Sequence, residues 1–186
     1  MLRGGEGFGR LGIGVPFYKP SYEFFRWWTW LVAGGFESGD VLLNGPDVPG
    51  EVAIPVAHNA IVRAFLATEA DTLCIVEDDH VGEQDVVRRL RDRGENWDYD
   101  IVCANYSKRS SDLELVGVAF TGEVSDYGEA ECRIDPMAAW ETGTQPVDCA
   151  ALGLVLIRRW VLEAMLGDQE PGDYHWFDWR GHNSQD

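Results

Sequence analysis

The feature that most constrains the fold of this chain is a short apolar run that ends in three carboxylates and an imidazole. Residues 72–76 read Thr-Leu-Cys-Ile-Val, and Glu77, Asp78, Asp79 and His80 follow directly. An apolar run of this length bounded by charge is typical of a β-strand that is buried on both faces. In open α/β sheets the ligand crevice lies beyond the carboxyl ends of the strands. We therefore expect the four polar residues to lie at a ligand-binding edge of a sheet.

These acids have two interpretations. Adjacent carboxylates repel one another and are costly to dehydrate, so three of them at the mouth of a buried strand are typical of a divalent-cation site. Acids also cap the helix that follows a strand, and Glu83 and Asp85 stand where the next helix is expected to begin. We favour the metal site because the acids follow a fully apolar strand, and the metal would in turn hold a phosphorylated substrate.

The charge of the chain limits its partners. Its 186 residues are enough for one domain with a core, and 15 basic against 32 acidic residues give a net charge of −17. Such a surface repels phosphate backbones, which argues against nucleic acid as a partner. A small anionic nucleotide would need a cation or a local basic cluster to overcome this field.

The sequence has no 18-residue apolar span, so no membrane span is expected. Residues 1–10 are Gly-rich and lack the apolar core of a signal peptide. We interpret them as a flexible leader to a single domain over residues 11–186, and we expect the protein to be cytoplasmic.

The order of the remaining patterns predicts an α/β fold, with a mostly parallel sheet flanked by helices. Strand-like runs alternate with helical periodicity along the first half of the chain: strands at 11–17, 40–43, 72–76 and 100–104, and helices at 22–32, 56–70 and 84–93. The second half predicts a hairpin from 115–120 and 129–134, a strand over 147–157 and a helix over 160–166. Gly153 interrupts that strand, and its missing side chain would let a ligand or a backbone approach closely.

Three further places could contact a ligand. Asn59 and Arg63 are four residues apart on one helix face, where they would either reach a ligand together or form a solvated polar stripe. Arg109 follows the strand at 100–104 and would either pair with phosphate or be solvated. Trp176 belongs to a tail that alternates aromatic rings with His and Asp, a pattern typical of sugar-binding loops.

Together these motifs resemble those of the GT-A glycosyltransferases, especially small bacterial and phage-like members in which an apolar strand ends in Asp-Asp-Asp-His. The segment from Glu77 to His80 is similar to their D-x-D segment. The other matching segments follow in the same order along the chain: Ala57-His58-Asn59, Asp100-Ile101-Val102 with Tyr106 and Arg109, Val147-Asp148, Gly153, Leu156-Ile157-Arg158-Arg159 and Ser184-Gln185-Asp186. The resemblance covers the chain from about Leu11 to Asp186.

The resemblance implies a GT-A fold and a metal-dependent transferase that moves a sugar from a UDP- or GDP-linked donor to the hydroxyl of an unknown acceptor. Glu77 and Asp79 would hold Mn²⁺ or Mg²⁺, which would stabilise the leaving diphosphate. Asp186 would be the base that takes the acceptor proton. The nucleotide-sugar pocket would be lined by Pro16, Tyr18, Asn59, Arg63, Asp78, Asp79 and Arg109, and the acceptor side by Gly153, Trp176 and Asp186.

The chain departs from the family pattern in three places. Glu77 replaces an Asp, His58 replaces an Arg, and the sequence ends at Asp186 where the family continues, so we expect a C-terminally truncated GT-A domain. Two rival interpretations follow. One is a catalytically inactive carbohydrate- or nucleotide-binding relative, or scaffold. The other is a nucleotidyltransferase, although residues 16–20 do not form the Gly-rich basic loop typical of such enzymes.

Overall fold

The structure is a computed structural model of the chain. It describes residues 8–17, 20–43, 54–104, 119–120, 144, 146–147, 149–150, 152–167 and 176–177. None of the helices within these ranges is long and apolar enough to cross a membrane.

The described residues form an α/β fold built on a five-stranded sheet, which confirms the predicted α/β class. The expected mostly parallel sheet is instead mixed, because two of its four strand pairings are antiparallel. The elements in chain order are β1 (Leu11–Gly14), α1 (Tyr22–Gly34), β2 (Val41–Leu42), α2 (Ile54–Leu66), β3 (Thr72–Val76), α3 (Val86–Trp97), β4 (Ile101–Cys103), β5 (Ala119–Phe120), β6 (Cys149–Ala150), β7 (Leu154–Arg158) and α5 (Arg159–Leu166). The predicted strand over 72–76 is confirmed at both ends, whereas the predicted helices differ from the observed ones by a few residues at their ends. The strand predicted over 129–134 lies outside the described residues.

The strand order in the main sheet is β2-β1-β3-β7-β4. β1 runs parallel to both β2 and β3, whereas β7 runs antiparallel to both of its neighbours, β3 and β4. The prediction of one strand over 147–157 is wrong, because the chain bends at residues 152–153 and its two halves join different sheets. β6 pairs with β5 in a separate two-stranded sheet, while β7 enters the centre of the main sheet.

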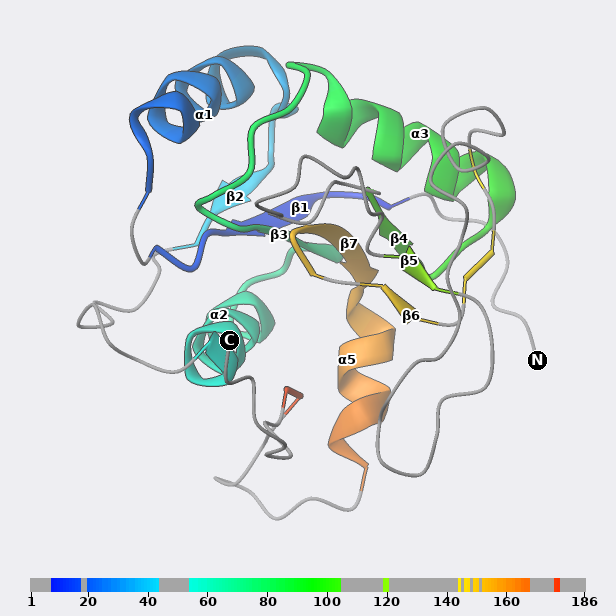
Figure 1. Cartoon of the computed structure of the whole chain (residues 1–186). Coiled ribbons are helices and arrows are strands. Elements are labelled where there is room, and N and C mark those ends of the chain that lie inside the picture. Colours follow the sequence, from blue (N-terminus) through cyan, green and yellow to red (C-terminus); the bar gives the residue numbers. More distant parts are fainter. Residues whose placement is uncertain are drawn as a thin grey trace.

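Helices cover both faces of the main sheet, with α1 and α3 on one face and α2 and α5 on the other (Figure 1). Side chains along β3 alternate between the two layers, as the pleat of a strand requires. Cys74 and Val76 pack with α1 and α3, whereas Leu73 and Ile75 pack with α2 and α5. All five residues of β3 are buried, so this strand is the centre of the core.

Glycines in β1 allow α2 to approach the sheet closely. A Cβ atom added at Gly12 would lie 2.7 Å from the Phe65 ring, and one at Gly14 would lie 2.3 Å from a methyl carbon of Ile61. Both distances are too short for real side chains, so α2 could not occupy its place against larger residues. This contact fixes the helix that carries His58 and Asn59.

The helix predicted over residues 84–93 extends further than expected. α3 continues through Gly94 to Trp97 and ends at Asp98, which has a left-handed backbone conformation with φ of 53°. A Cβ atom at Gly94 would lie only 1.7 Å from the ring of Phe8, which is fully buried. The missing side chain of Gly94, in the middle of α3, therefore makes room for the Phe8 ring.

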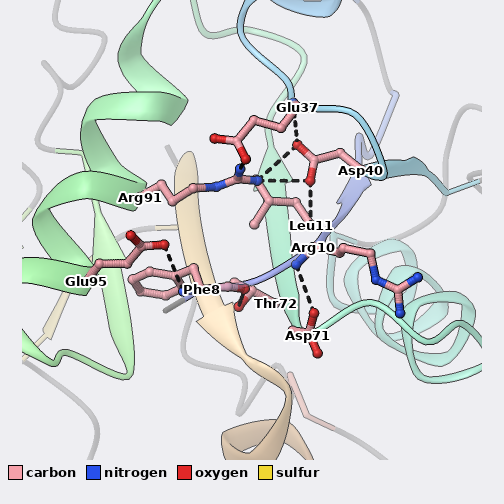
Figure 2. Close-up of polar contacts among 9 residues, drawn as sticks. All are labelled: Phe8, Arg10, Leu11, Glu37, Asp40, Asp71, Thr72, Arg91 and Glu95. Carbon is pink, nitrogen blue, oxygen red and sulfur yellow. Dashed lines mark hydrogen bonds and ion pairs between the residues drawn. The ribbon is translucent and has the colours of Figure 1, made fainter. Parts of the chain in front are cut away.

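A buried ion pair joins α3 to the amino end of the sheet (Figure 2). Arg91 donates to both carboxylate oxygens of Asp40, at 2.9 and 3.0 Å, and also pairs with Glu37. Asp40 accepts the backbone N–H groups of Leu11 and Glu37, each at 2.8 Å. This network lies where β1 begins, at the opposite end of the sheet from the acids that follow β3.

Candidate metal centre

The acid cluster begins where β3 ends. The backbone N–H of Glu77 donates to the carbonyl of Gly153 at 2.8 Å, which extends the β3–β7 pairing by one residue. The chain then turns, and the N–H of His80 donates to the carbonyl of Glu77 at 3.2 Å. A tight turn of this kind brings side chains at positions 77, 79 and 80 together.

Three potential metal ligands meet at this turn. Glu77, Asp79 and His80 each offer one ligand atom, and these atoms all lie within 4.8 Å of one another. The Nδ1 atom of His80 lies 2.8 Å from Oδ1 of Asp79. Their side chains are partly accessible, with exposed fractions of 27% for Glu77, 39% for Asp79 and 15% for His80. Both ring nitrogens of His80 are buried, so a cation from solvent would meet the two carboxylates first.

The electrostatics of the cluster favour a bound cation. Burial raises the pKa of Glu77 above its usual value, and the neighbouring charges of Asp79 and then Asp78 raise this pKa further. A positive ion would offset both causes, because it stabilises the charged form of each carboxylate. Two carboxylates and an imidazole suit a transition metal such as Mn²⁺, whereas Mg²⁺ prefers carboxylates and water. The side chains present are therefore of types that can hold the predicted Mn²⁺ or Mg²⁺.

The interpretation of the acids as helix caps is wrong for this helix. α3 begins only at Val86, and the side chain of Asp85 at its N-cap makes no capping hydrogen bond. Asp85 instead pairs with Arg88 and Arg89, and Glu83 also pairs with Arg89. These contacts leave the cluster of Glu77, Asp79 and His80 apart from the start of the helix.

Helix α1 anchors the loop that follows the cluster. The indole N–H of Trp27 donates to the carbonyl of Glu83 at 3.3 Å, and the side-chain amide of Gln84 donates to the carbonyl of Trp30 at 3.2 Å. Trp27 is buried within the α1 layer of the core. The aromatic helix thus fixes the loop that carries His80.

The sequence analysis named His58 only as the replacement of a family arginine and did not predict its contact with Glu77. His58 lies on α2 and is only 1% exposed, and its Nε2 atom is 3.6 Å from Oε1 of Glu77. This distance is within ion-pair range, although it is too long for a hydrogen bond. The His58 ring also lies 5.3 Å from the ring of Phe177, measured between centroids. No pattern in the sequence relates residues 58, 77 and 177, because the fold alone brings them together.

The structure places Asn59 and Trp176, both predicted to contact a ligand, in a buried network. Asn59 is 3% exposed, and its side chain bonds to the backbone of Trp176 and Phe177 through three hydrogen bonds of 2.8 to 3.0 Å. Trp176 is 6% exposed, and its indole N–H donates to the carbonyl of Leu162 in α5 at 2.8 Å. Both side chains are therefore engaged in packing, and their contacts with a nucleotide or a sugar stay predictions.

The other predicted site residues are distributed as follows. Pro16 follows β1, at the same edge of the sheet as Glu77, because β1 and β3 are parallel. Gly153 lies beside Glu77 through the backbone hydrogen bond, and Asp78 is buried with 8% exposure. Arg63 is exposed on α2, so it does not share the environment of Asn59. Three predicted residues lie outside the described part of the chain: Tyr18, Arg109 and Asp186.

No known protein-family model matches this sequence, and no curated protein shows significant similarity to it.

Proposed function

We propose that this protein is a metal-dependent glycosyltransferase that moves a sugar from a nucleoside-diphosphate sugar to an acceptor hydroxyl. The observation that carries this proposal is the cluster of Glu77, Asp79 and His80 at the carboxyl end of the central strand. The resemblance of the sequence to the GT-A family supports the same function.

The charge of the molecule explains why such an enzyme would need its metal. With a net charge of −17, the protein repels a diphosphate, and Asp78 and Asp79 add to this repulsion at the site. A divalent cation held by Glu77, Asp79 and His80 would reverse the local field and stabilise negative charge on the departing diphosphate.

The position of the cluster also fits a nucleotide-sugar site. Ligands of α/β sheets bind at the carboxyl ends of strands, and the ends of β1 and β3 meet here. Pro16 and Gly153 lie at this edge, where neither adds charge. The resemblance assigns the proton-accepting role to Asp186, a carboxylate that would make the acceptor hydroxyl a better nucleophile.

The test measures the melting temperature after Mn²⁺ is added and again after a nucleotide is added. Addition of Mn²⁺ should raise the melting temperature, and UDP or GDP should raise it further only when Mn²⁺ is present. Asp79→Asn should abolish both shifts. The matched control is Asp85→Asn, because the two side chains are similarly exposed, at 39% and 41%, yet Asp85 lies outside the cluster.

Turnover decides between this function and a second candidate. Asn59 and Trp176 were expected to face substrates but are engaged in packing, which favours a relative that binds a nucleotide sugar without transferring the sugar. Release of UDP or GDP from a panel of nucleotide sugars, dependent on Mn²⁺, would support the transferase. Tight binding without release would support the inactive relative, and absence of any metal-dependent binding would refute both.

A further inference from the structure

We propose that His58 is a positioning residue for this metal centre, which holds the Glu77 carboxylate in the orientation that a cation requires. The inference rests on the proposed metal-dependent function and adds a residue to its site. His58 and Glu77 come from different elements, α2 and the end of β3, so their contact is a product of the tertiary fold.

The arrangement places the imidazole on the inner side of the carboxylate. The His58 side chain is 2% exposed, whereas that of Glu77 is 27% exposed, and their nearest N and O atoms are 3.6 Å apart. His58 is not among the three residues whose ligand atoms are mutually within 4.8 Å. His58 therefore contacts the cluster through Glu77, and it would act on a bound cation through that carboxylate.

A glutamate at this position needs such support. Its side chain has one more rotatable bond than the aspartate usual in a D-x-D segment, so binding a metal would cost more conformational entropy. A neighbour that restricts the carboxylate reduces this cost before the metal arrives. Outer contacts of this kind commonly change metal affinity by about 10- to 100-fold.

His58 is itself firmly held. α2 packs against Gly12 and Gly14 through Phe65 and Ile61, which sets the height of the helix above the sheet. The Phe177 ring contacts the imidazole, and Asn59 fixes the Phe177 backbone. The buried imidazole therefore has packing partners besides Glu77 that limit its movement.

The experiment compares two replacements of His58 in the full chain, with Mn²⁺ as the probe. His58→Met keeps a similar volume without a nitrogen donor, whereas His58→Gln keeps an N–H group that can reach Glu77. Titration of the electron paramagnetic resonance signal of free Mn²⁺ gives each dissociation constant. We expect His58→Met to raise the Mn²⁺ dissociation constant about tenfold or more. The constant of His58→Gln should be closer to that of the unmodified protein.

Two measurements distinguish a positioning role of His58 from a general loss of stability and from direct binding of the metal by His58. Thr72→Val serves as the control, because Thr72 is fully buried and donates to the Phe8 carbonyl, at the opposite end of β3 from the cluster. This variant should lose stability yet keep its Mn²⁺ affinity. Electron spin echo modulation of bound Mn²⁺ should show nitrogen coupling from one imidazole, that of His80, unchanged in His58→Met.

The outcomes are distinct. If the unmodified protein binds Mn²⁺ and His58→Met binds it equally well, the positioning role is refuted while the metal site stands. Loss of one of two imidazole couplings in His58→Met would make His58 a ligand, which also refutes positioning. If the unmodified protein binds no Mn²⁺, the proposed function fails and this inference fails with it. Should His58→Met not fold, His58→Phe replaces it, because a phenyl ring retains the packing against Phe177 without any nitrogen.

Discussion

Asn59 binds both backbone groups of Phe177. Its Oδ1 atom accepts the Phe177 N–H at 3.0 Å, and its Nδ2 atom donates to the Phe177 carbonyl at 2.8 Å. The same Oδ1 atom also accepts the N–H of Trp176 at 2.8 Å. One buried amide on α2 thus satisfies three backbone groups of a segment more than 100 positions away in the sequence.

Replacement of Asn59 should therefore reduce stability. In Asn59→Ala the backbone groups of Trp176 and Phe177 would lose their partners in a buried environment, which we expect to lower the free energy of unfolding by about 3 kcal/mol. Urea denaturation measures this loss. Arg63→Ala, one turn further along the same helix but at an exposed position, should change the free energy by less than about 0.5 kcal/mol. Equal effects of the two substitutions would contradict the anchoring role of Asn59.

Glu77 should oppose folding in the absence of metal. Its pKa is raised by burial and by the charges of Asp79 and Asp78, so between the unfolded and folded pKa values the folded protein binds more protons than the unfolded chain. Stability then falls as the pH rises through this window. Glu77→Gln removes this penalty, and we expect it to stabilise the metal-free protein by about 1 kcal/mol at neutral pH, with no gain at a pH below the unfolded pKa.

The same substitution should abolish stabilisation by Mn²⁺, because the neutral amide is a poor metal ligand. Thermal melts at acidic and neutral pH, with and without Mn²⁺, measure both effects. The control is Glu69→Gln, at a carboxylate that is 92% exposed and lies outside the cluster. A Glu77→Gln variant that is less stable than the unmodified protein at neutral pH would contradict the electrostatic account of the site.

Arg91 should be required for folding and not for the metal centre. Its side chain is 7% exposed and pairs with Asp40, which is 3% exposed (Figure 2). Arg91→Met would leave the Asp40 charge buried without its main partner, which we expect to cost about 3 to 5 kcal/mol in urea denaturation. Arg88→Met, on the same helix with 63% exposure, should cost less than about 0.5 kcal/mol.

The double variant Arg91→Met/Asp40→Asn tests the reason for this loss. With both charges removed, much of the stability should return, because no unpaired charge stays buried. Mn²⁺ affinity should be unchanged in the folded fraction, since the pair lies at the amino end of β1 and the acid cluster at the carboxyl end of β3. A loss of stability in the double variant as large as in Arg91→Met would show that packing and not charge is responsible.

The extent to which the sequence predicts this structure depends on how local each signal is. The strand over residues 72–76 was predicted to its exact ends, because a fully apolar run closed by charge is a property of adjacent residues. The approximate helices followed from periodicity in the same way. The direction of β7 could not be predicted, since it is set by pairing with β3 and β4 across more than 50 residues. The helix expected to end at residue 93 continues through Gly94, because this glycine makes room for the ring of Phe8, which is far away in the sequence.

In the candidate site, too, contacts between sequence neighbours were predictable and contacts between distant residues were not. Glu77, Asp79 and His80 are neighbours in the sequence, so their meeting at the end of a strand was predictable from the acids themselves. The contact between His58 and Glu77 was not, because it depends on how closely α2 packs against Gly12 and Gly14. The hydrogen bonds that bury Asn59 and Trp176 were not predicted, for a related reason. A polar or aromatic residue satisfied by a distant backbone has the same local pattern as one that contacts a substrate.

Cys74 should make the protein sensitive to alkaline pH. Burial raises the pKa of its thiol from 9.0 to about 12, and the charge of Asp40 adds to this effect while Arg91 partly opposes it. Between these pH values the unfolded chain releases a proton that the folded protein keeps, so stability falls as the pH rises. We expect Cys74 to account for a loss of about 1 kcal/mol between pH 8 and pH 10. Urea denaturation at both pH values should show that the free energy of unfolding falls less between pH 8 and pH 10 in Cys74→Ala than in the unmodified protein. This comparison does not depend on the stability of the variant at pH 8. Thr72→Val weakens the same strand without removing an ionisable group, so its pH dependence should equal that of the unmodified protein, and an equal dependence in Cys74→Ala would contradict this role of the thiol.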